Sequence, residues 1–254
     1  MAASTDTTHP FGIDFGGSGI KGDPVDLSTG EFASERTRYE TPEGGKPQDV
    51  ADVVARLVAE GADDGAHVGI TVPAVVSHGT VKSAANIDDS WIYTDAATMF
   101  RDKLRRDVVV VNDADAAGLA EVRYGAARGE RGLVVLTTLG TGIGTALLYD
   151  GVLVPNAELG HIEIDGKDAE TVTANSVREK KGLSWEKWAE RLTTYYRTLE
   201  KLLSPDLFVV GGGVSKQAEK YLPLLDIETR IVPAQLRNTA GIVGAAVLAA
   251  ELGS

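Results

Sequence analysis

The sequence predicts an α/β fold. Short apolar runs alternate along the chain with segments whose apolar residues recur at three- and four-residue steps, and this alternation is typical of strands and helices in a sheet-based fold. A glycine-rich turn occurs twice, each time after a strand-like run, which indicates two halves facing each other across a cleft. The chain has 254 residues, 43% of them apolar and 24% charged, which suffices for one large domain or two lobes.

The first half is predicted to begin with a hairpin. A strand is expected at 11–15, followed by the first glycine-rich turn and a partner strand. Residues 49–60 carry valines and a leucine at helical spacing, which predicts an amphipathic helix. Two further short strands are expected at 68–72 and 108–111.

The second half alternates in the same way. A helix is expected at 114–125 and a strand at 133–138, before the second glycine-rich turn; a strand at 207–210 and a small-residue helix at 241–252 follow. The clearest helix starts after Ser184, a candidate N-cap. We expect its recurring aromatic and leucine side chains in the core, namely Trp185, Trp188, Leu192, Tyr195, Leu199 and Leu202.

Both glycine-rich turns suit phosphate. Glycines let the backbone adopt positive φ and approach a ligand closely, and a neighbouring hydroxyl adds a donor. Neither turn is a P-loop or opens a helix as a dinucleotide fingerprint does, and a plain tight hairpin is the alternative for either copy alone. The candidate phosphate-binding residues are Gly16, Gly17, Ser18, Gly19, Gly140, Thr141 and Gly142, with Lys21 either on phosphate or in solvent.

Asn112 and Asp113 follow an apolar strand. Ligands gather at the carboxyl ends of strands in open α/β sheets, where a carboxylate can take a proton from a hydroxyl that the neighbouring amide binds. The alternative is a helix N-cap before Ala114. The local sequence leaves both roles open.

Glu158 and His161 are three residues apart, so a turn or short helix would place both on one side. A carboxylate and an imidazole match the donors and acceptors of sugar hydroxyls. Half of a metal site is the alternative, in a chain without cysteines or a histidine cluster nearby. Asn86 lies in an Asn-Ile-Asp-Asp loop that by itself indicates only a turn.

Seven segments carry a recognisable pattern in order: Gly-Ile-Asp-Phe-Gly-Gly-Ser-Gly-Ile-Lys-Gly (12–22), Ser-Ala-Ala-Asn-Ile-Asp-Asp-Ser-Trp (83–91), Val-Asn-Asp-Ala-Asp-Ala-Ala-Gly-Leu-Ala-Glu (111–121), and the stretches 139–144, 158–161, 206–213 and 238–246. The chain thereby resembles the ROK family of sugar kinases in the actin/hexokinase-like ATPase superfamily. Within that family it is most similar to the branch of polyphosphate-dependent glucokinases. The resemblance covers nearly the whole chain.

The resemblance implies an α/β fold of two ribonuclease H-like lobes with an interlobe cleft. Residues 1–112 would form the N-terminal lobe, with helix 241–252 packed back on it, and residues 113–240 the C-terminal lobe. A cytoplasmic homodimer is also expected.

The implied reaction is phosphoryl transfer from inorganic polyphosphate, with ATP as an alternative donor, to the 6-hydroxyl of glucose. Asp113 would be the catalytic base, and the sugar would be bound by Asn86, Asn112, Asp113, Glu158, His161 and Glu170. Asp14 would help to hold Mg²⁺ through water, and the phosphate-binding set would include Gly211, Gly212 and Gly213. A strictly ATP-dependent hexokinase for glucose, mannose or N-acetylmannosamine is the alternative.

Composition excludes several classes of function. Many ROK kinases carry a cysteine-rich zinc loop after the Gly-His motif, but no cysteine follows His161 here, so no zinc is expected. A net charge of −12 argues against nucleic acid as a partner and, with it, against the ROK sugar-responsive repressors, whose helix-turn-helix is not seen ahead of the first strand. No apolar run approaches the ~18 residues that cross a bilayer, and the first residues lack signal-peptide features.

Residues 178–201 reverse the local charge. The segment has seven basic residues against four glutamates. It is either a track for polyphosphate, whose binding would release counterions, or a solvated helix face with offsetting pairs.

Overall fold

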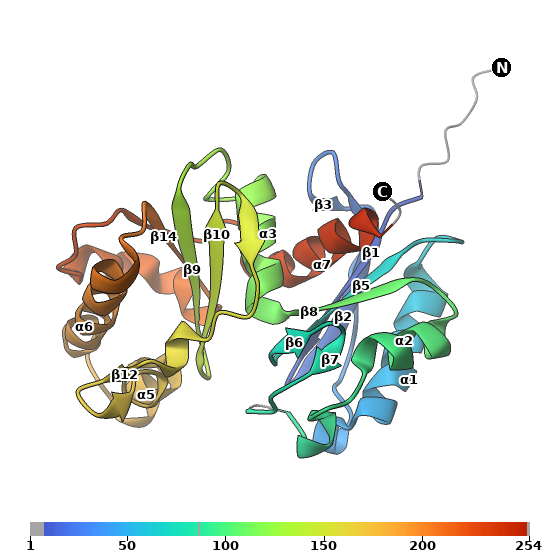
Figure 1. The fold of residues 1–254 in the computed structure, drawn as a ribbon, viewed down its shortest axis with the longest axis horizontal. Helices are drawn as coiled ribbons and strands as arrows, with labels where there is room; N and C mark the ends of the chain where they lie inside the picture. Colours follow the sequence, from blue (N-terminus) through green and yellow to red (C-terminus); the bar gives the residue numbers. More distant parts are fainter. Residues whose placement is uncertain (1–7, 86, 253–254) are drawn as a thin grey trace. The chain divides into compact units, whose positions relative to one another are not determined.

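The computed structural model describes residues 8–85 and 87–252, and the chain forms two compact units. The first unit comprises Met1–Ala116 and Gly241–Ser254, and the second comprises Ala117–Ala240. Each is built on one main mixed sheet (Figure 1). None of the helices in the described part of the chain has the length and apolar character needed to span a membrane.

The main sheet of the first unit has the strand order β3-β2-β1-β5-β8, with β4 also paired to β2. Strands β1 and β2 form the antiparallel hairpin around the first glycine-rich turn, whereas β1, β5 and β8 run parallel. The strands are β1 (Phe11–Gly16), β2 (Gly19–Asp26), β3 (Glu31–Phe32), β4 (Thr37–Tyr39), β5 (Val68–Val72) and β8 (Val108–Asn112), beside a small hairpin of β6 (Val76–Ser77) and β7 (Thr80–Val81).

Helices α1 (Pro47–Gly61) and α2 (Ala96–Leu104) pack on one face of this sheet, and α7 (Ala240–Glu251) packs on the other. The two-residue period of the strands sets this division. Phe11, Ile13 and Phe15 of β1 belong to the same buried cluster as the valines and leucine of α1, whereas Gly12 between them faces α7.

Glycines allow α7 to lie close to the sheet. A Cβ on Gly12 would overlap the backbone carbonyl of Ile242, and one on Gly69 would overlap that of Ala245. Any side chain at these positions would therefore force the helix away from the strands.

The second unit repeats the strand arrangement of the first. Its main sheet has the order β11-β10-β9-β14-β15, in which β9 and β10 are antiparallel and β9, β14 and β15 are parallel. The strands are β9 (Leu133–Leu139), β10 (Ile143–Tyr149), β11 (Val152–Val154), β14 (Leu207–Gly211) and β15 (Ile231–Pro233), with a separate hairpin of β12 (Glu163–Ile164) and β13 (Lys167–Asp168).

Helix α3 (Asp113–Tyr124) begins in the first unit and continues into the second, where it packs with one face of the sheet. The other face packs against α6 (Trp185–Leu203), with α4 (Glu170–Thr173) and α5 (Asn175–Lys180) preceding α6 in the chain. Both sheets are thus covered by helices on both faces, the arrangement expected of an α/β fold.

The strands and helices predicted from the sequence are confirmed to within a few residues. Ser184 caps α6 by accepting a hydrogen bond from the Lys187 N–H. The expected core face of α6 is wrong at Leu202, which is 63% exposed. The buried cluster ends before this last turn, where the neighbouring Leu203 makes the remaining contact.

Candidate functional site

The first glycine-rich turn joins β1 to β2, with Gly16 paired to Gly19. Two side chains hold its carbonyls: Arg38 donates from Nη2 to the Ser18 oxygen at 2.8 Å, and Thr41 donates its hydroxyl to the Gly16 oxygen at 2.6 Å. Around Gly17 there is open space where a Cβ would stand. The turn therefore presents its backbone to solvent or to a ligand.

Asp14 lies on β1, on the face that packs against α7. Its Oδ2 is 3.3 Å from Lys21 Nζ, and its Oδ1 accepts a hydrogen bond of 3.2 Å from the Thr71 hydroxyl. The sequence offered phosphate or solvent as the environment of Lys21, and the structure adds a third: the ammonium is paired with Asp14. Strand register explains the pair, because the two residues are direct cross-strand neighbours.

Asn112 ends β8 and Asp113 begins α3. The Asn112 Oδ1 accepts hydrogen bonds from the N–H groups of Ala114 (2.8 Å) and Asp115 (3.1 Å), and its Nδ2 donates to the Ala74 carbonyl at 3.1 Å. Asn112 therefore supplies the N-cap. Asp113 Oδ1 also accepts from the Ala114 N–H, at 2.9 Å, but this bond only duplicates the cap.

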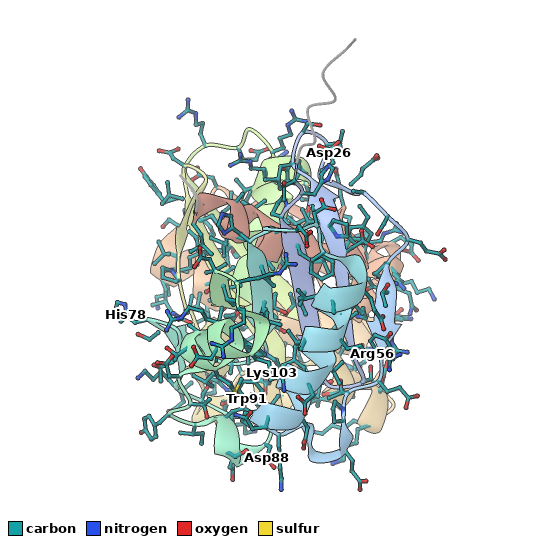
Figure 2. All side chains as sticks on the ribbon, turned by 90° about the vertical axis from the view of Figure 1, so that its right-hand side faces the viewer. Asp26, Arg56, His78, Asp88, Trp91 and Lys103 are labelled. Atoms are coloured by element: carbon teal, nitrogen blue, oxygen red, sulfur yellow. The ribbon has the colours of Figure 1, made fainter. Side chains whose placement is uncertain are left out.

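Asn86 lies outside the described residues, but the loop that follows it is well anchored. Trp91 is fully buried and donates its indole N–H to the Gly45 carbonyl at 2.8 Å, and its ring centroid lies 5.6 Å from that of Phe15 in a tilted arrangement. Asp88 accepts a hydrogen bond of 2.9 Å from the Ser90 N–H. Figure 2 shows Asp88 and Trp91 at the same end of the first unit.

The second glycine-rich turn joins β9 to β10 and is held from two directions. Ser176, on α5, donates its N–H to the Gly140 carbonyl at 3.0 Å and its hydroxyl to the Thr141 carbonyl at 2.6 Å. Glu170, at the start of α4, accepts the Ile143 N–H at 2.6 Å. Glu170 was predicted only as a sugar ligand, and its bond to this turn was not foreseen.

The two turns share one property. Their carbonyls accept hydrogen bonds, whereas the described residues offer no acceptor to the backbone N–H groups of Gly17, Ser18, Thr141 and Gly142. Consecutive unpaired N–H groups form a concave site for anions. The geometry is thus suited to bind phosphate oxygens at each turn.

Gly211, Gly212 and Gly213 lie beside the second turn. Gly211 pairs with Thr138 across the parallel strands β14 and β9. Gly212 has φ of 80°, and a Cβ there would overlap the backbone of Leu139, so only glycine fits. Gly213 borders open space, which leaves its backbone accessible.

Glu158 and His161 are brought together by a 3₁₀ turn over Leu159–His161, with 4.0 Å between Glu158 Oε2 and His161 Nε2. The His161 Nδ1 lies 2.8 Å from Asp168 Oδ2. Because a carboxylate only accepts, Nδ1 carries a proton in this pair, and Nε2 remains on the side of Glu158.

The hydrogen bond to Asp168 is the main reason why the pKa of His161 is raised above its ordinary value of 6.5; partial desolvation opposes it, and the charges of Glu170 and Glu158 add to it. The pKa of Glu158 is also raised, chiefly by desolvation, although 42% of its side chain is exposed. Both groups consequently hold a proton more readily than usual.

Comparison with known proteins decides the family. The ROK family model matches residues 10–176. The chain belongs to the ROK family.

Its relatives cover nearly its whole length. The chain is 49% identical over 245 residues to a polyphosphate glucokinase of Mycobacterium tuberculosis, covering 96% of this chain and 92% of that protein. The structure of an inorganic polyphosphate/ATP-glucomannokinase from an Arthrobacter strain is 52% identical with a TM-score of 0.92, covering 97% of this chain and all of that one. A ROK glucokinase from Streptomyces griseus, solved with glucose and AMPPNP, is 25% identical with a TM-score of 0.80, covering 96% and 99%. The predicted family and its actin/hexokinase-like fold are confirmed.

Two side chains near the predicted ROK site were missed. Arg38 lies on β4, opposite Lys21 of β2; nothing local in the sequence marks it, because its position depends on strand pairing. Asp168 had a usable signal: Asp165-Gly166 is a turn-forming pair, and the hairpin it makes places Asp168 on β13 near His161.

The basic segment at 178–201 is divided by the structure. Arg178 lies over the Trp185 ring at 4.1 Å, Lys187 pairs with Glu190, and Arg197 pairs with Asp226. These three cations have local partners, so the segment is not one uniform basic track. In the described residues, no group of three or more His, Cys, Asp or Glu side chains is arranged to hold a metal ion.

Proposed function

We propose that this protein phosphorylates the 6-hydroxyl of glucose, with inorganic polyphosphate as donor and ATP as a second donor. The observation that carries the proposal is 49% identity to a polyphosphate glucokinase over 96% of the chain. The matching identity of 52% to a polyphosphate/ATP-glucomannokinase supports the same donors and makes mannose the second sugar to test.

Asp113 is the base in this proposal. The 6-hydroxyl oxygen attacks the terminal phosphorus, the new O–P bond forms, the bond to the remaining phosphate chain breaks, and the hydroxyl proton passes to the Asp113 carboxylate. The shortened chain leaves as an oxyanion. Support comes from the cap geometry, because Asn112 already caps α3 and the Asp113 carboxylate is not needed for that purpose.

Glu158 and His161 are proposed to bind sugar hydroxyls, together with Asn86, Asn112 and Glu170. His161 Nε2 and the Glu158 carboxylate lie 4.0 Å apart, which suits one donor and one acceptor on neighbouring hydroxyls. Asp168 positions His161 through its Nδ1. Glu170 would connect the sugar to the second glycine-rich turn through the Ile143 N–H.

The glycine-rich turns are proposed to bind the phosphoryl groups, with Asp14 holding Mg²⁺ through water. The donor set fits, because Mg²⁺ prefers oxygen ligands and is usually bound through one or two carboxylates plus substrate phosphates, and Asp14 supplies a carboxylate beside the first turn. Bound Mg²⁺ would neutralise charge on the phosphate chain. Lys21 balances the Asp14 charge at 3.3 Å.

We further propose that the two units are the two lobes predicted from the sequence, and that the protein works as a cytoplasmic homodimer without nucleic-acid or membrane partners. Sedimentation of the purified protein measures the oligomeric state.

The test is a coupled assay for glucose 6-phosphate with long-chain polyphosphate or ATP, with Mg²⁺ and after its removal by EDTA. We expect turnover with both donors, a higher kcat/KM with polyphosphate, and no turnover without the metal. Turnover with ATP alone would replace the donor assignment with the ATP-dependent hexokinase, and no sugar phosphorylation with either donor would refute the function.

A further inference from the structure

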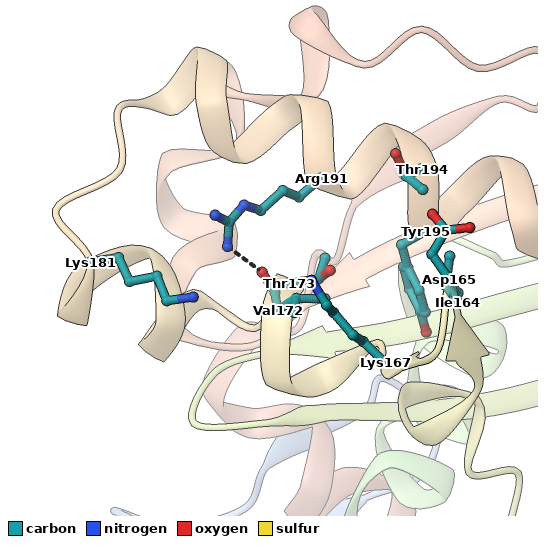
Figure 3. A pocket seen from close by; sticks show the side chains of 9 residues that line it. All are labelled: Ile164, Asp165, Lys167, Val172, Thr173, Lys181, Arg191, Thr194 and Tyr195. Atoms are coloured by element: carbon teal, nitrogen blue, oxygen red, sulfur yellow. Dashed lines mark hydrogen bonds between the residues drawn. The ribbon is translucent and has the colours of Figure 1, made fainter.

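The second unit contains a cavity of about 310 Å³. None of the residues that line it is among those predicted to bind sugar or to form the glycine-rich phosphate turns. It lies among the β12–β13 hairpin, α4, the end of α5 and α6 (Figure 3). Its volume is at the small end of the range for ligand pockets. The lining residues are Ile164, Asp165, Lys167, Val172, Thr173, Lys181, Arg191, Thr194 and Tyr195.

The charge of the cavity is opposite to that of the protein. Lys167, Lys181 and Arg191 line it against the single carboxylate of Asp165, in a chain of net charge −12. Figure 3 shows the three cationic side chains extending from three different elements toward the Val172–Thr173 end of α4. Cations that converge from separate elements, without matching carboxylates, are suited to bind an anion.

These cations have N–H groups that remain available to a ligand. Arg191 uses Nη1 on the Val172 carbonyl at 2.8 Å, which fixes the guanidinium at the cavity. Among the described residues, the ammonium groups of Lys167 and Lys181 have no hydrogen bond or ion pair. Tyr195 also lines the cavity, and its buried hydroxyl has no hydrogen-bond partner in the described structure.

Two short helices connect the cavity to the second glycine-rich turn. Helix α4 begins at Glu170, which accepts the Ile143 N–H of the turn, and ends at Thr173 in the cavity. Helix α5 is tied to the turn through Ser176 and is followed by Lys181. Five residues at 1.5 Å of rise separate Ser176 from Lys181 by about 8 Å, so a chain of several phosphoryl groups could extend from the turn to the cavity.

We propose that this cavity is an anion subsite for a polyphosphate donor, holding phosphoryl groups beyond those at the site of transfer. The proposal rests on the proposed function. Here no bond is made or broken; Lys167, Lys181 and Arg191 bind phosphate oxygens and so raise the affinity for a long chain. A longer donor fills more of the path from the turn into the cavity, so ATP and tripolyphosphate gain less from these cations than a long chain does.

The test is the double substitution Lys167→Ala/Lys181→Ala. Both side chains are exposed, so the fold should survive, which thermal unfolding checks. Each exposed charge contact contributes only modestly to binding, so we expect the loss of two to raise KM for long-chain polyphosphate about fivefold. The dependence of log(kcat/KM) on log[salt] should become shallower by about 1.4, at roughly 0.7 for each charge removed. KM for tripolyphosphate and ATP should stay within about twofold of the wild type.

Lys201→Ala is the matched comparison. It removes the same charge from α6, ten residues beyond Arg191 and so about 15 Å along the helix. If the cavity is the subsite, this variant should keep the polyphosphate KM of the wild type. If polyphosphate instead binds along the whole basic segment, KM should rise as much as on loss of one cavity lysine.

Three results would overturn the subsite: an unchanged polyphosphate KM in the double variant, an equal rise for all three donors, or an equal effect of Lys201→Ala. A wild type that turns over ATP but not polyphosphate would instead refute the donor assignment, and the subsite with it. Calorimetric titration of wild type and double variant with long-chain polyphosphate, inorganic phosphate and glucose 6-phosphate identifies the occupant. The proposal is overturned if the wild type binds inorganic phosphate or glucose 6-phosphate tightly, the double variant loses this binding, and both bind the long chain equally. The cavity would then be a site for the small anion.

Discussion

Replacing Asp113 by asparagine separates its two possible roles, the base and the helix cap. The substitution conserves volume and keeps an oxygen at Oδ1, which can still accept the Ala114 N–H that Asp113 holds at 2.9 Å. Asn112 holds the same N–H at 2.8 Å and that of Asp115 at 3.1 Å. The start of α3 is therefore satisfied in the variant.

The expected effects differ by several kcal/mol. Loss of a general base costs about 10²–10⁴-fold in rate, which corresponds to about 3–5 kcal/mol of activation free energy. The free energy of unfolding should change by less than about 1 kcal/mol, because a cap as a whole is worth about that much and Asp113 only shares it. In a chain of this size the change in Tm should stay below about 2–4 °C.

The assay measures kcat and KM for glucose with saturating donor, and unfolding by circular dichroism. Asp95→Asn is the matched control, because Asp95 caps α2 in the same unit through a 3.0 Å bond from the Thr98 N–H; it should keep full kcat. Asp113→Asn with kcat within a few-fold of wild type and normal stability would refute the base assignment. A large loss of stability would contradict the expectation that the start of α3 remains satisfied in the variant.

Three further perturbations follow from the structure. Asp168→Asn should lower the pKa of His161 in an NMR titration and raise KM for glucose. The raised pKa means tighter proton binding in the folded state, so this proton stabilises the protein fully below about pH 6.5. The difference in unfolding free energy between wild type and variant should therefore shrink as pH rises through the raised pKa. Arg38→Ala should raise KM for both donors several-fold without changing KM for glucose, because the guanidinium contacts the Ser18 carbonyl of the phosphate turn; unchanged donor KM would remove Arg38 from the site. Glu121→Gln should lower the free energy of unfolding in urea by about 2–4 kcal/mol. This buried carboxylate accepts three backbone N–H groups from two separate segments, and an amide cannot accept all three. A loss below about 1 kcal/mol would contradict this account.

The sequence predicted the elements well because their signals are local. The strand at 68–72 and the core positions of α6 follow from the spacing of their apolar residues. The two hairpins follow from clusters of glycine, which are typical of tight turns. The prediction was wrong at Leu202 because the spacing of apolar residues along a helix does not show where the buried cluster beside that helix ends. The family motifs further predict Asp113, Glu158 and His161 as site residues, and these roles remain predictions.

Contacts that depend on register could not be read from the sequence. Asp14 and Lys21 are seven residues apart, and they pair because a hairpin places them opposite each other. The hydrogen bond from Arg38 to the Ser18 carbonyl depends on a further strand pairing, that of β4 with β2. Asp168 was predictable only if the Asp-Gly turn had been used to set the register of β12 and β13.

The two glycine-rich turns show why the repeated fold matters for function. Their sequences differ, and the side chains that hold them are unrelated: Arg38 and Thr41 at the first turn, Ser176 at the second. In each case these residues hold carbonyls, and the N–H groups of Gly17, Ser18, Thr141 and Gly142 stay without acceptors in the described structure. A carbonyl that points toward a phosphate would repel it, so fixing the carbonyls elsewhere leaves only donors for the ligand. Different residues thus leave backbone N–H groups without acceptors at both turns, and this shared geometry is suited to bind an anion at each of them.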